Sequence, residues 1–263
     1  MLSGRASWDR VEDVLVEERD FLRRFVSEQR VQTNEVQRCW ALLPCFLELA
    51  RRTGATTFDM IELGTSAGLL LSWHHCHYRY ETGEWGQHET LLRLAGEERR
   101  PVPAPLLERE LVLRNRVGID LEPVDLTTDE GALLLRSFVW ADRRDRLARL
   151  DQAISVFRHD PPEIVQGDFF EVLPKLLARR RPGALTVVLQ VAVADYFSER
   201  VSKELEAALS EGGAAGPLAY VSTGRPEDRS DNYWGLWVST WPGGEREMLA
   251  HADFHGAWLE WLT

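Results

Sequence analysis

The residues best suited to catalysis or ligand binding lie in one glycine-rich segment, Glu62-Leu63-Gly64-Thr65-Ser66-Ala67-Gly68. This segment follows a short apolar run at residues 57–63 and precedes another at residues 69–73. Glycines let the backbone turn tightly and let a ligand approach the peptide plane. A helix that begins behind such a turn offers free backbone N–H groups. Glu62 places a carboxylate at the strand end, where a nucleotide-like ligand with an amino group would suit it.

Two further carboxylates follow apolar runs in the same way. Asp120 comes after one such run, and an acid at the end of a second strand can accept hydrogen bonds from both hydroxyls of a ribose. Asp168, followed by Phe169, comes after a short strand predicted at residues 163–166. Both acids also have a purely structural interpretation, Asp120 as a turn residue and Asp168 as the N-cap of the next helix.

The pattern acid-x-Gly-x-Ser-x-Gly resembles the first motif of class I S-adenosylmethionine-dependent methyltransferases. The resemblance implies that Glu62, Gly64, Thr65, Ser66, Ala67 and Gly68 bind this cofactor. It also implies that Asp120 binds the ribose, and that Asp168 accepts from the adenine amino group while Phe169 covers the ring. A strand-to-helix turn needs small residues whatever it binds, so the motif alone leaves a structural role open.

The turn also reads Gly-x-Ser-x-Gly, the nucleophile elbow of α/β-hydrolases, with Ser66 as the nucleophile. The order of a hydrolase triad would require a downstream acid, Asp195 or Asp228. It would also require a later histidine, His251 or His255. However, the turn follows the first strand of the predicted sheet, and no His-Gly-Gly-Gly oxyanion loop precedes it. We therefore favour the methyltransferase over the serine hydrolase.

Composition and charge limit the class of protein. The 263 residues are 44% hydrophobic and 28% charged, which fits one large domain with an appendage. The net charge of −11 argues against a general nucleic-acid-binding protein. No apolar run is long enough to span a membrane, and the start lacks the order of a signal peptide. Three cysteines, an odd number, indicate a reducing compartment, so we expect a cytoplasmic protein.

Apolar periodicity predicts a helical N-terminal cap at residues 1–53. Its second helix should begin with Thr33 or Asn34 as N-cap, and Pro44 should kink or break that helix. Gly54 should end it.

Residues 54–263 alternate apolar strand patterns with helix patterns, which indicates an α/β, three-layer Rossmann-like methyltransferase fold with a mostly parallel sheet. Residues 184–193 form a nearly continuous apolar run, as expected for a strand buried on both faces. An insertion at about residues 78–117 carries predicted strands at 88–94 and 110–117. Antiparallel strands are predicted in the C-terminal region.

Seven longer segments resemble one family, the bacterial domain of unknown function 2332, which is common in actinobacteria. The segments are residues 32–38, 62–71, 118–125, 139–142, 146–150, 241–244 and 255–261. The resemblance covers residue 30 to the end of the chain. It implies a methyltransferase fold without an assigned substrate.

The chain departs from the pattern of that family in three respects. Its helical N-terminal region is short, and Leu69 follows the glycine turn where members usually carry Asn. Gln190 and Val191 stand where the fourth strand of members ends in a His and a small hydroxyl residue, although Tyr196 remains. We take Tyr196, Gln190 and His255 as candidate catalytic residues. The change at Gln190 favours an alternative, a non-catalytic binding protein that contacts a partner or forms a homodimer through its N-terminus.

A polar cluster of Asn34, Glu35 and Arg38 precedes the first strand. It is either a capping box or a lid that reaches over the glycine turn to contact cofactor or substrate. We expect no metal site in His74-His75-Cys76-His77, because consecutive helical residues point in different directions and no second cluster completes a ligand set. The acidic surface and the tryptophan-rich C-terminus favour an apolar or aromatic small molecule as substrate. The sequence therefore predicts methyl transfer from S-adenosylmethionine to such a molecule, a reaction that depends mainly on positioning.

Overall fold

The computed structural model describes residues 8–29, 31–32, 34–194, 197–226 and 232–263, and the chain divides into two compact units, Met1–Thr33 and Asn34–Thr263. The first unit contains two helices, α1 (Trp8–Glu17) and α2 (Arg19–Glu28). None of their residues is buried, so their apolar side chains are open to solvent.

The helix α3 (Arg38–Thr53) belongs to the second unit, and its residues 38–50 are all buried. It begins with Gln37 as its N-cap, so the predicted start at Asn34 is wrong, and Thr33 lies outside the described residues. Its start is later because residues 34 and 35 make side-chain contacts with other elements. Gly54 ends the helix in the left-handed conformation, with φ of 71°, as predicted.

Helix α3 continues through Pro44, so the predicted break does not occur. Proline has no N–H, and the carbonyl of Trp40, four residues earlier, therefore loses its helical partner. The hydroxyl of Tyr80 donates a hydrogen bond to this carbonyl at 2.5 Å. The Tyr80 ring also stacks on the Trp40 ring, with centroids 5.3 Å apart. A side chain from a distant segment thus replaces the hydrogen bond that the proline removes.

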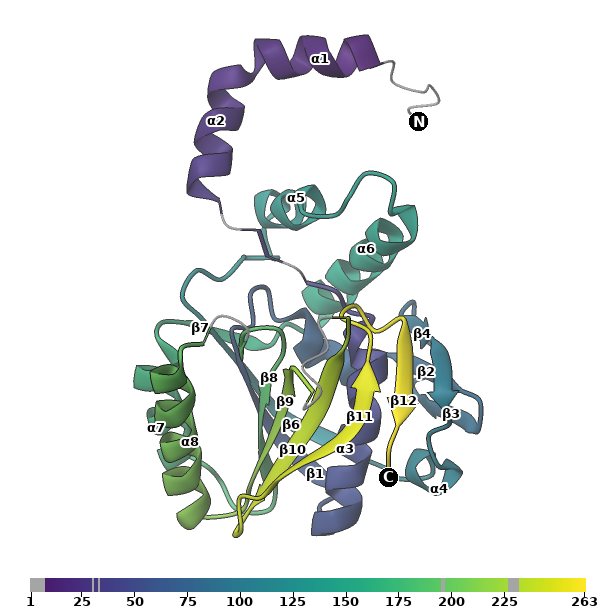
Figure 1. Ribbon diagram of the computed structural model, residues 1–263, viewed down its shortest axis with the longest axis vertical. Helices are drawn as coiled ribbons and strands as arrows, with labels where there is room; N and C mark the ends of the chain where they lie inside the picture. Colours follow the sequence, from purple (N-terminus) through teal and green to yellow (C-terminus); the bar gives the residue numbers. More distant parts are fainter. Residues whose placement is uncertain (1–7, 30, 33, 195–196, 227–231) are drawn as a thin grey trace. The chain divides into compact units, whose positions relative to one another are not determined.

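The second unit is built on a nine-stranded sheet in the order β5-β12-β11-β10-β9-β8-β1-β6-β7 (Figure 1). Five neighbouring strands are parallel: β1 (Thr57–Leu63), β6 (Val112–Asp120), β7 (Glu163–Gln166), β8 (Leu185–Gln190) and β9 (Leu218–Gly224). Three C-terminal strands continue the sheet in antiparallel pairs: β10 (Trp234–Trp241), β11 (Arg246–Ala252) and β12 (Trp258–Trp261). The predicted mixed sheet is therefore confirmed.

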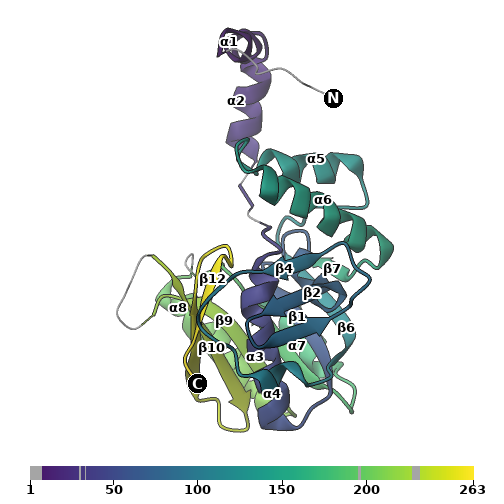
Figure 2. The same cartoon turned by 90° about the vertical axis from the view of Figure 1, so that its right-hand side faces the viewer.

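Helices cover both faces of the sheet, which confirms the three-layer α/β, Rossmann-like fold. On one face, α7 (Phe169–Ala178) and α8 (Glu199–Ala214) bury leucines against β1, β6 and β8. On the other face, α3 packs against β10, and α6 (Arg144–His159) packs against η1 (Leu69–His75), the 3₁₀ helix that follows β1. Helix α5 (Asp129–Ser137) lies beside α6, near the carboxyl ends of the parallel strands (Figure 2).

A segment between β1 and β6 forms a second, three-stranded sheet in the order β3-β2-β4. Its elements are β2 (His77–Tyr80), β3 (Gly83–Gly86) and β4 (Arg93–Ala95), followed by β5 (Glu97–Arg100) and α4 (Ala104–Leu107). The strand that we predicted at 110–117 inside an insertion is β6 of the central sheet, and it continues to Asp120. Its first half carries exposed polar side chains, which concealed a central strand in the sequence pattern.

Candidate functional site

The carboxyl ends of the parallel strands form one edge of the sheet, and the predicted cofactor residues lie at or just after the ends of three of them, β1, β6 and β7. Strand β1 pairs with β6 on one side and with β8 on the other, so the strand order reverses beside β1. Open α/β sheets bind ligands in the crevice at such a switch point. Leu63 lies in register with Ile119 of β6 and Gln190 of β8, and Asp120 lies in register with Gln166 of β7.

Backbone hydrogen bonds to β6 hold the first half of the glycine turn. The N–H groups of Gly64 and Thr65 both donate to the carbonyl of Ile119, at 2.8 and 3.1 Å. Gly64 has φ of 67°, and a side chain at this position would collide with Val193 of the loop after β8. Gly64 is therefore required by the approach of two chain segments, and two N–H groups of the turn have protein partners.

The second half of the turn packs into the core. Ala67 has no exposed surface, and Gly68 has φ of 76° with Ile164 of β7 in the space that a side chain would need. The helix behind the turn is a 3₁₀ helix, η1 (Leu69–His75). The turn thus joins β1 to η1 tightly, as the sequence predicted, and within it Gly64 and Ser66 are half-buried whereas Thr65, Ala67 and Gly68 are buried.

Glu62 is a buried carboxyl beneath the turn, and 2% of it is exposed. Its Oε2 accepts a hydrogen bond from Thr65 Oγ1 at 2.6 Å. Burial raises the pKa of Glu62 to about 8; the Thr65 hydrogen bond and the charge of Arg38 lower it, and the charge of Asp120 raises it. Glu62 is therefore largely protonated at neutral pH, and a cationic ligand group would favour its ionised form.

Asp120, at the end of β6, is hydrogen-bonded to the backbone of the glycine turn. Its Oδ2 accepts a hydrogen bond from the backbone N–H of Ser66 at 2.7 Å, and its Oδ1 accepts one from the N–H of Glu122 at 2.9 Å. Each oxygen of an ionised carboxylate can accept more than one hydrogen bond. The half-buried Asp120 can therefore hold the turn and still accept from ligand hydroxyls.

Asp168 is the N-cap of α7, which is the structural interpretation that the sequence left open. Its Oδ1 accepts a hydrogen bond from the N–H of Phe170 at 2.8 Å, and its side chain is exposed. Phe169 packs against Phe170 and Phe197, with ring centroids 4.5 and 5.6 Å apart. The cap uses one carboxylate oxygen, so Oδ2 can accept from a ligand.

Ser66 contacts the predicted lid. It has φ of 53°, in the left-handed region, and its Oγ accepts a hydrogen bond from Asn34 Nδ2 at 2.5 Å. His251, a candidate for a hydrolase triad, has its Nδ1 3.1 Å from Glu260 Oε2. The two acids predicted for that triad, Asp195 and Asp228, lie outside the described residues. Ser66 therefore contacts an amide, and His251 contacts a carboxylate other than the two predicted for the triad.

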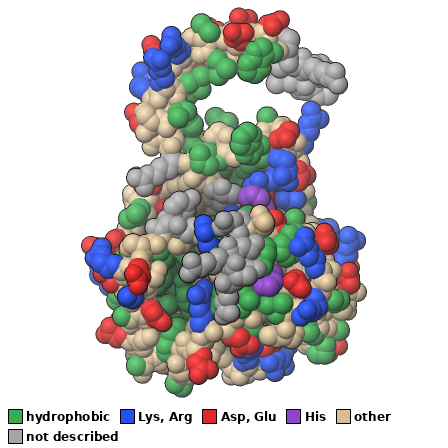
Figure 3. All heavy atoms as spheres, in the orientation of Figure 1, with side chains coloured by type: hydrophobic (Ala, Val, Ile, Leu, Met, Phe, Trp, Pro, Cys, Tyr) green, Lys and Arg blue, Asp and Glu red, His purple; other side chains and the backbone are tan. Residues whose placement is uncertain are grey.

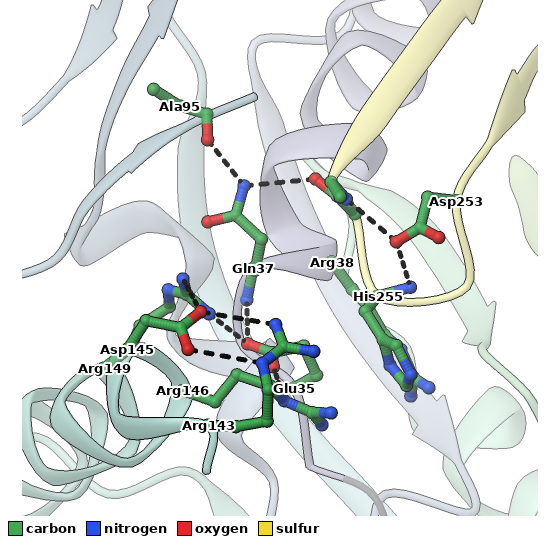
Figure 4. A network of polar contacts seen from close by, with 12 residues as sticks. Glu35, Gln37, Arg38, Ala95, Arg143, Asp145, Arg146, Arg149, Asp253 and His255 are labelled. Atoms are coloured by element: carbon green, nitrogen blue, oxygen red, sulfur yellow. Dashed lines mark hydrogen bonds and ion pairs between the residues drawn. The ribbon is translucent and has the colours of Figure 1, made fainter. Parts of the chain in front are cut away.

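Glu35 points toward α6, where two arginines bind it (Figure 4). Its Oε2 lies 2.5 Å from Arg146 Nε and its Oε1 lies 2.9 Å from Arg149 Nη1. The N–H of Gln37 also donates to Oε1, at 3.1 Å. With 4% of Glu35 exposed, this ion pair is buried, and loss of one partner would cost about 3–5 kcal/mol. Sequence reasoning missed these arginines, although their spacing of three residues on a predicted helix places them on one face.

Arg38 and His255 lie near one another in Figure 4. Arg38 Nε donates to the carbonyl of Phe254 at 2.9 Å, and its guanidinium carbon lies 4.9 Å from the centre of the Trp234 ring. Burial lowers the pKa of Arg38 to about 10. Burial and the charges of Arg146 and Arg38 lower the pKa of His255, whose buried Nδ1 has no hydrogen-bond partner among the described residues. His255 is therefore a neutral imidazole beside cationic groups.

Gln190 is fully buried at the end of β8. With its amide oriented to satisfy both polar atoms, the oxygen accepts from the N–H groups of Val193 and Ala194 at 2.8 and 2.7 Å. The nitrogen donates to the carbonyl of Thr223 at 3.3 Å. Gln190 thus fixes the loop that covers Gly64. Tyr196, the third catalytic candidate, lies outside the described residues.

Two side-chain groups outside the carboxyl edge have the donor chemistry of metal sites: His74, His75 and Asp160, and His77, Glu84 and His88. In the first group Asp160 already pairs with Arg116 at 2.7 Å and with His75 at 2.8 Å. In the second group His77 Nε2 lies 3.4 Å from Glu84 Oε2, on the small sheet. The first group is therefore an ion-pair cluster around one carboxylate.

The fold and its switch point define an α/β protein of the Rossmann-like class. The chain belongs to the family described as uncharacterized proteins conserved in bacteria, DUF2332, whose model matches residues 3–261. Two structures of the bifunctional kinase-methyltransferase WbdD are similar to it, each at 15% identity and a TM-score of 0.32. The match covers 76% of this chain and 35% of the WbdD chain. No protein of curated function matches the chain.

Proposed function

We propose that the carboxyl edge binds S-adenosylmethionine and that the protein transfers the methyl group to a small molecule. The observation that carries this proposal is the position of three carboxylates at the carboxyl ends of neighbouring strands beside the switch point: Glu62 of β1 and Asp120 of β6 contact the glycine turn, and Asp168 follows β7. Such a donor set suits a nucleoside with two ribose hydroxyls, an exocyclic amine and a cationic amino group.

Each carboxylate has a separate role in this proposal. Asp120 would accept from the ribose hydroxyls, because it combines two oxygens with a position beside the turn. Asp168 Oδ2 would accept from the adenine amino group, with the half-buried ring of Phe169 against the base. Glu62 would lose its proton and pair with the amino group of the methionine part, which compensates for its burial.

S-adenosylmethionine supplies a methyl group on a sulfonium, which is reactive without further activation by the protein. The residues of this chain then have to hold donor and acceptor in line and exclude water. The loop after β8, fixed by Gln190 and packed over Gly64 through Val193, would form one wall of that position. Gln190 itself has an amide, which does not take up a proton at neutral pH, so its proposed role is positioning.

The ribose contact provides a direct test. In Asp120→Asn, an N–H donor replaces one acceptor and the charge is lost, so we expect affinity for S-adenosylhomocysteine to fall about tenfold or more. Asp125→Asn is the control, since Asp125 is an exposed acid that accepts from Thr127 in the same loop. Equal affinities for the wild type and Asp120→Asn, with both proteins folded, would remove the ribose contact from the proposal.

The alternative is a binding protein that has kept the fold without catalysis. The buried Gln190 favours it, because the amide stands where a histidine is expected and is committed to the loop. Under this alternative S-adenosylhomocysteine still binds. A radiolabelled methyl group of S-adenosylmethionine would then pass to no small molecule of a bacterial extract, whereas methyl transfer predicts a labelled product.

A further inference from the structure

A cavity of about 470 Å³ lies between α8 and the strands β9, β10 and β11. In the space-filling view, the surface beside α8 is recessed, with hydrophobic side chains at its floor (Figure 3). Its volume is in the range of sites for small molecules. The residues that line it include Gln190, Phe197, Glu206, Tyr220, Trp241 and Arg246.

The cavity begins beside the glycine turn. Gln190, on its wall, is in register with Leu63, the residue before Gly64. Ala194 and Phe197 of the loop after β8 line the same end, and Phe197 contacts Phe169. The cavity and the candidate cofactor site therefore share the loop after β8.

Arg246, together with Arg225, gives the cavity a positive charge. Its guanidinium carbon lies 4.1 Å from the centre of the Trp237 ring, which holds the planar group over β10. Gly224 leaves room for its Nη2, since a side chain there would approach that atom to 3.3 Å. Within the described part of the chain, Arg246 forms no ion pair or hydrogen bond, although the charge of Glu206 acts on it. The guanidinium is thus oriented by stacking and not by a carboxylate of the protein.

The remaining lining residues define what could pair with Arg246. Tyr220, Ser222 and Ser239 contribute hydroxyl groups, and burial raises the pKa of Tyr220 to about 12, so its hydroxyl is neutral. Glu206, on the α8 side, offsets one of the two arginine charges, so the lining suits a ligand with one negative charge. A carboxylate carries one negative charge and matches the two parallel donors of a guanidinium. Phe197 and Trp241 add apolar surface that could contact a flat group of such a ligand.

We propose that this cavity binds a small molecule that combines one carboxylate, paired with Arg246, with a flat apolar group. The binding of such a molecule is argued from the cavity residues alone. The further statement that this molecule is the methyl acceptor rests on the proposed function, because it requires that the neighbouring turn binds the methyl donor.

The test uses three ligands of one shape: 2-naphthoate, its neutral analogue 2-naphthamide, and 2-naphthyl phosphate. Titration calorimetry of the full chain should show that 2-naphthoate binds, and that it binds about tenfold more tightly than either other ligand. The Arg246→Gln variant should bind 2-naphthoate no more tightly than 2-naphthamide. Arg99→Gln should keep the preference for 2-naphthoate, and this variant is a matched control because Arg99 also stacks on a tryptophan, Trp258 at 3.6 Å, outside the cavity.

Three results would overturn the proposal: no binding of 2-naphthoate at millimolar concentration, equal binding of acid and amide, or a preference that survives Arg246→Gln in a folded variant. Tighter binding of 2-naphthyl phosphate would overturn the choice of a monoanion. S-adenosylhomocysteine is titrated separately. If 2-naphthoate binds and S-adenosylhomocysteine does not, the proposed function is wrong and the carboxylate site is supported. If S-adenosylhomocysteine binds and 2-naphthoate does not, the cofactor site is supported and the carboxylate site is wrong.

Discussion

Thr65 Oγ1 donates a buried hydrogen bond of 2.6 Å to Glu62 Oε2, beneath the backbone of the glycine turn. Thr65 can occupy this position because Gly118 of β6 has no side chain, which would otherwise collide with Thr65. The acid of the motif is therefore held by a residue of the same turn, and it is almost completely buried. The ionisation of Glu62 should therefore change when its burial or its hydrogen bond to Thr65 changes.

The first prediction concerns the pH dependence of stability. Glu62 has a folded-state pKa of about 8, above its ordinary value of 4.5, so the native state holds a proton that the unfolded chain releases. The stability from this group is complete below the ordinary pKa and is lost as the pH rises through the folded-state pKa. Urea unfolding of the wild type should therefore show a free energy of unfolding that falls from about pH 7 to pH 8, the upper part of the interval between the two pKa values.

Glu62→Gln provides the control, because an amide of the same shape does not titrate. Its free energy of unfolding should be flatter over the same interval. His74 and His255 do not interfere, since burial lowers the pKa of both below 6.5. Parallel curves for the wild type and the variant would show that Glu62 is already ionised in the native protein.

The second prediction separates the two roles of Asp168. Asp168→Ala removes the cap of α7 and should cost about 1 kcal/mol of stability. Asp168→Ser retains a capping oxygen but loses the second carboxylate oxygen and the charge. We expect Asp168→Ser to unfold like the wild type and to bind S-adenosylhomocysteine about tenfold more weakly. Unchanged affinity in both variants would mean that Asp168 is a helix cap alone.

The third prediction concerns the fit between Gly64 and Val193. Gly64→Ala places a methyl group against Val193 and forces φ of 67° on alanine, so it should destabilise the fold by about 1–3 kcal/mol. Val193→Ala should relieve the collision and leave the backbone cost. A double-mutant cycle by thermal unfolding measures this coupling. Purely additive effects would contradict the packing of the loop after β8 over the turn.

The fourth prediction addresses the hydrolase alternative. Ser66 Oγ accepts from an amide of Asn34, which cannot take its proton and so cannot activate it as a nucleophile. A fluorophosphonate probe should therefore leave Ser66 unlabelled, as judged by mass spectrometry of the intact protein. Stoichiometric labelling that disappears in Ser66→Ala would establish a serine hydrolase.

Much of the central fold was predictable because its signals are local. The unbroken apolar run at 184–193 marks β8, and the glycine turn marks the end of β1. The acids after β6 and β7 could be assigned to one edge because parallel strands align their carboxyl ends. The sequence could not distinguish a cap from an adenine contact at Asp168, since both require a carboxylate at the same position.

Other features depend on contacts between distant segments. Helix α3 passes through Pro44 because Tyr80 supplies a donor for the freed carbonyl of Trp40. Glu35 is bound by Arg146 and Arg149, more than a hundred positions later in the chain, so its motif alone left a capping box and a lid as alternatives. The local sequence around Trp40 or Glu35 does not indicate these partners. They are set by side-chain packing between elements that are far apart in the chain.

The most direct test of the central claim is calorimetric titration of the full chain with S-adenosylhomocysteine, together with thermal unfolding at the same ligand concentrations. A ligand that binds only the folded state stabilises it increasingly as the ligand concentration rises above Kd, so the melting temperature of the protein rises with ligand concentration. We predict saturable heat with one site per chain and a melting temperature that rises with ligand. No heat and no shift at millimolar S-adenosylhomocysteine would contradict the methyltransferase account.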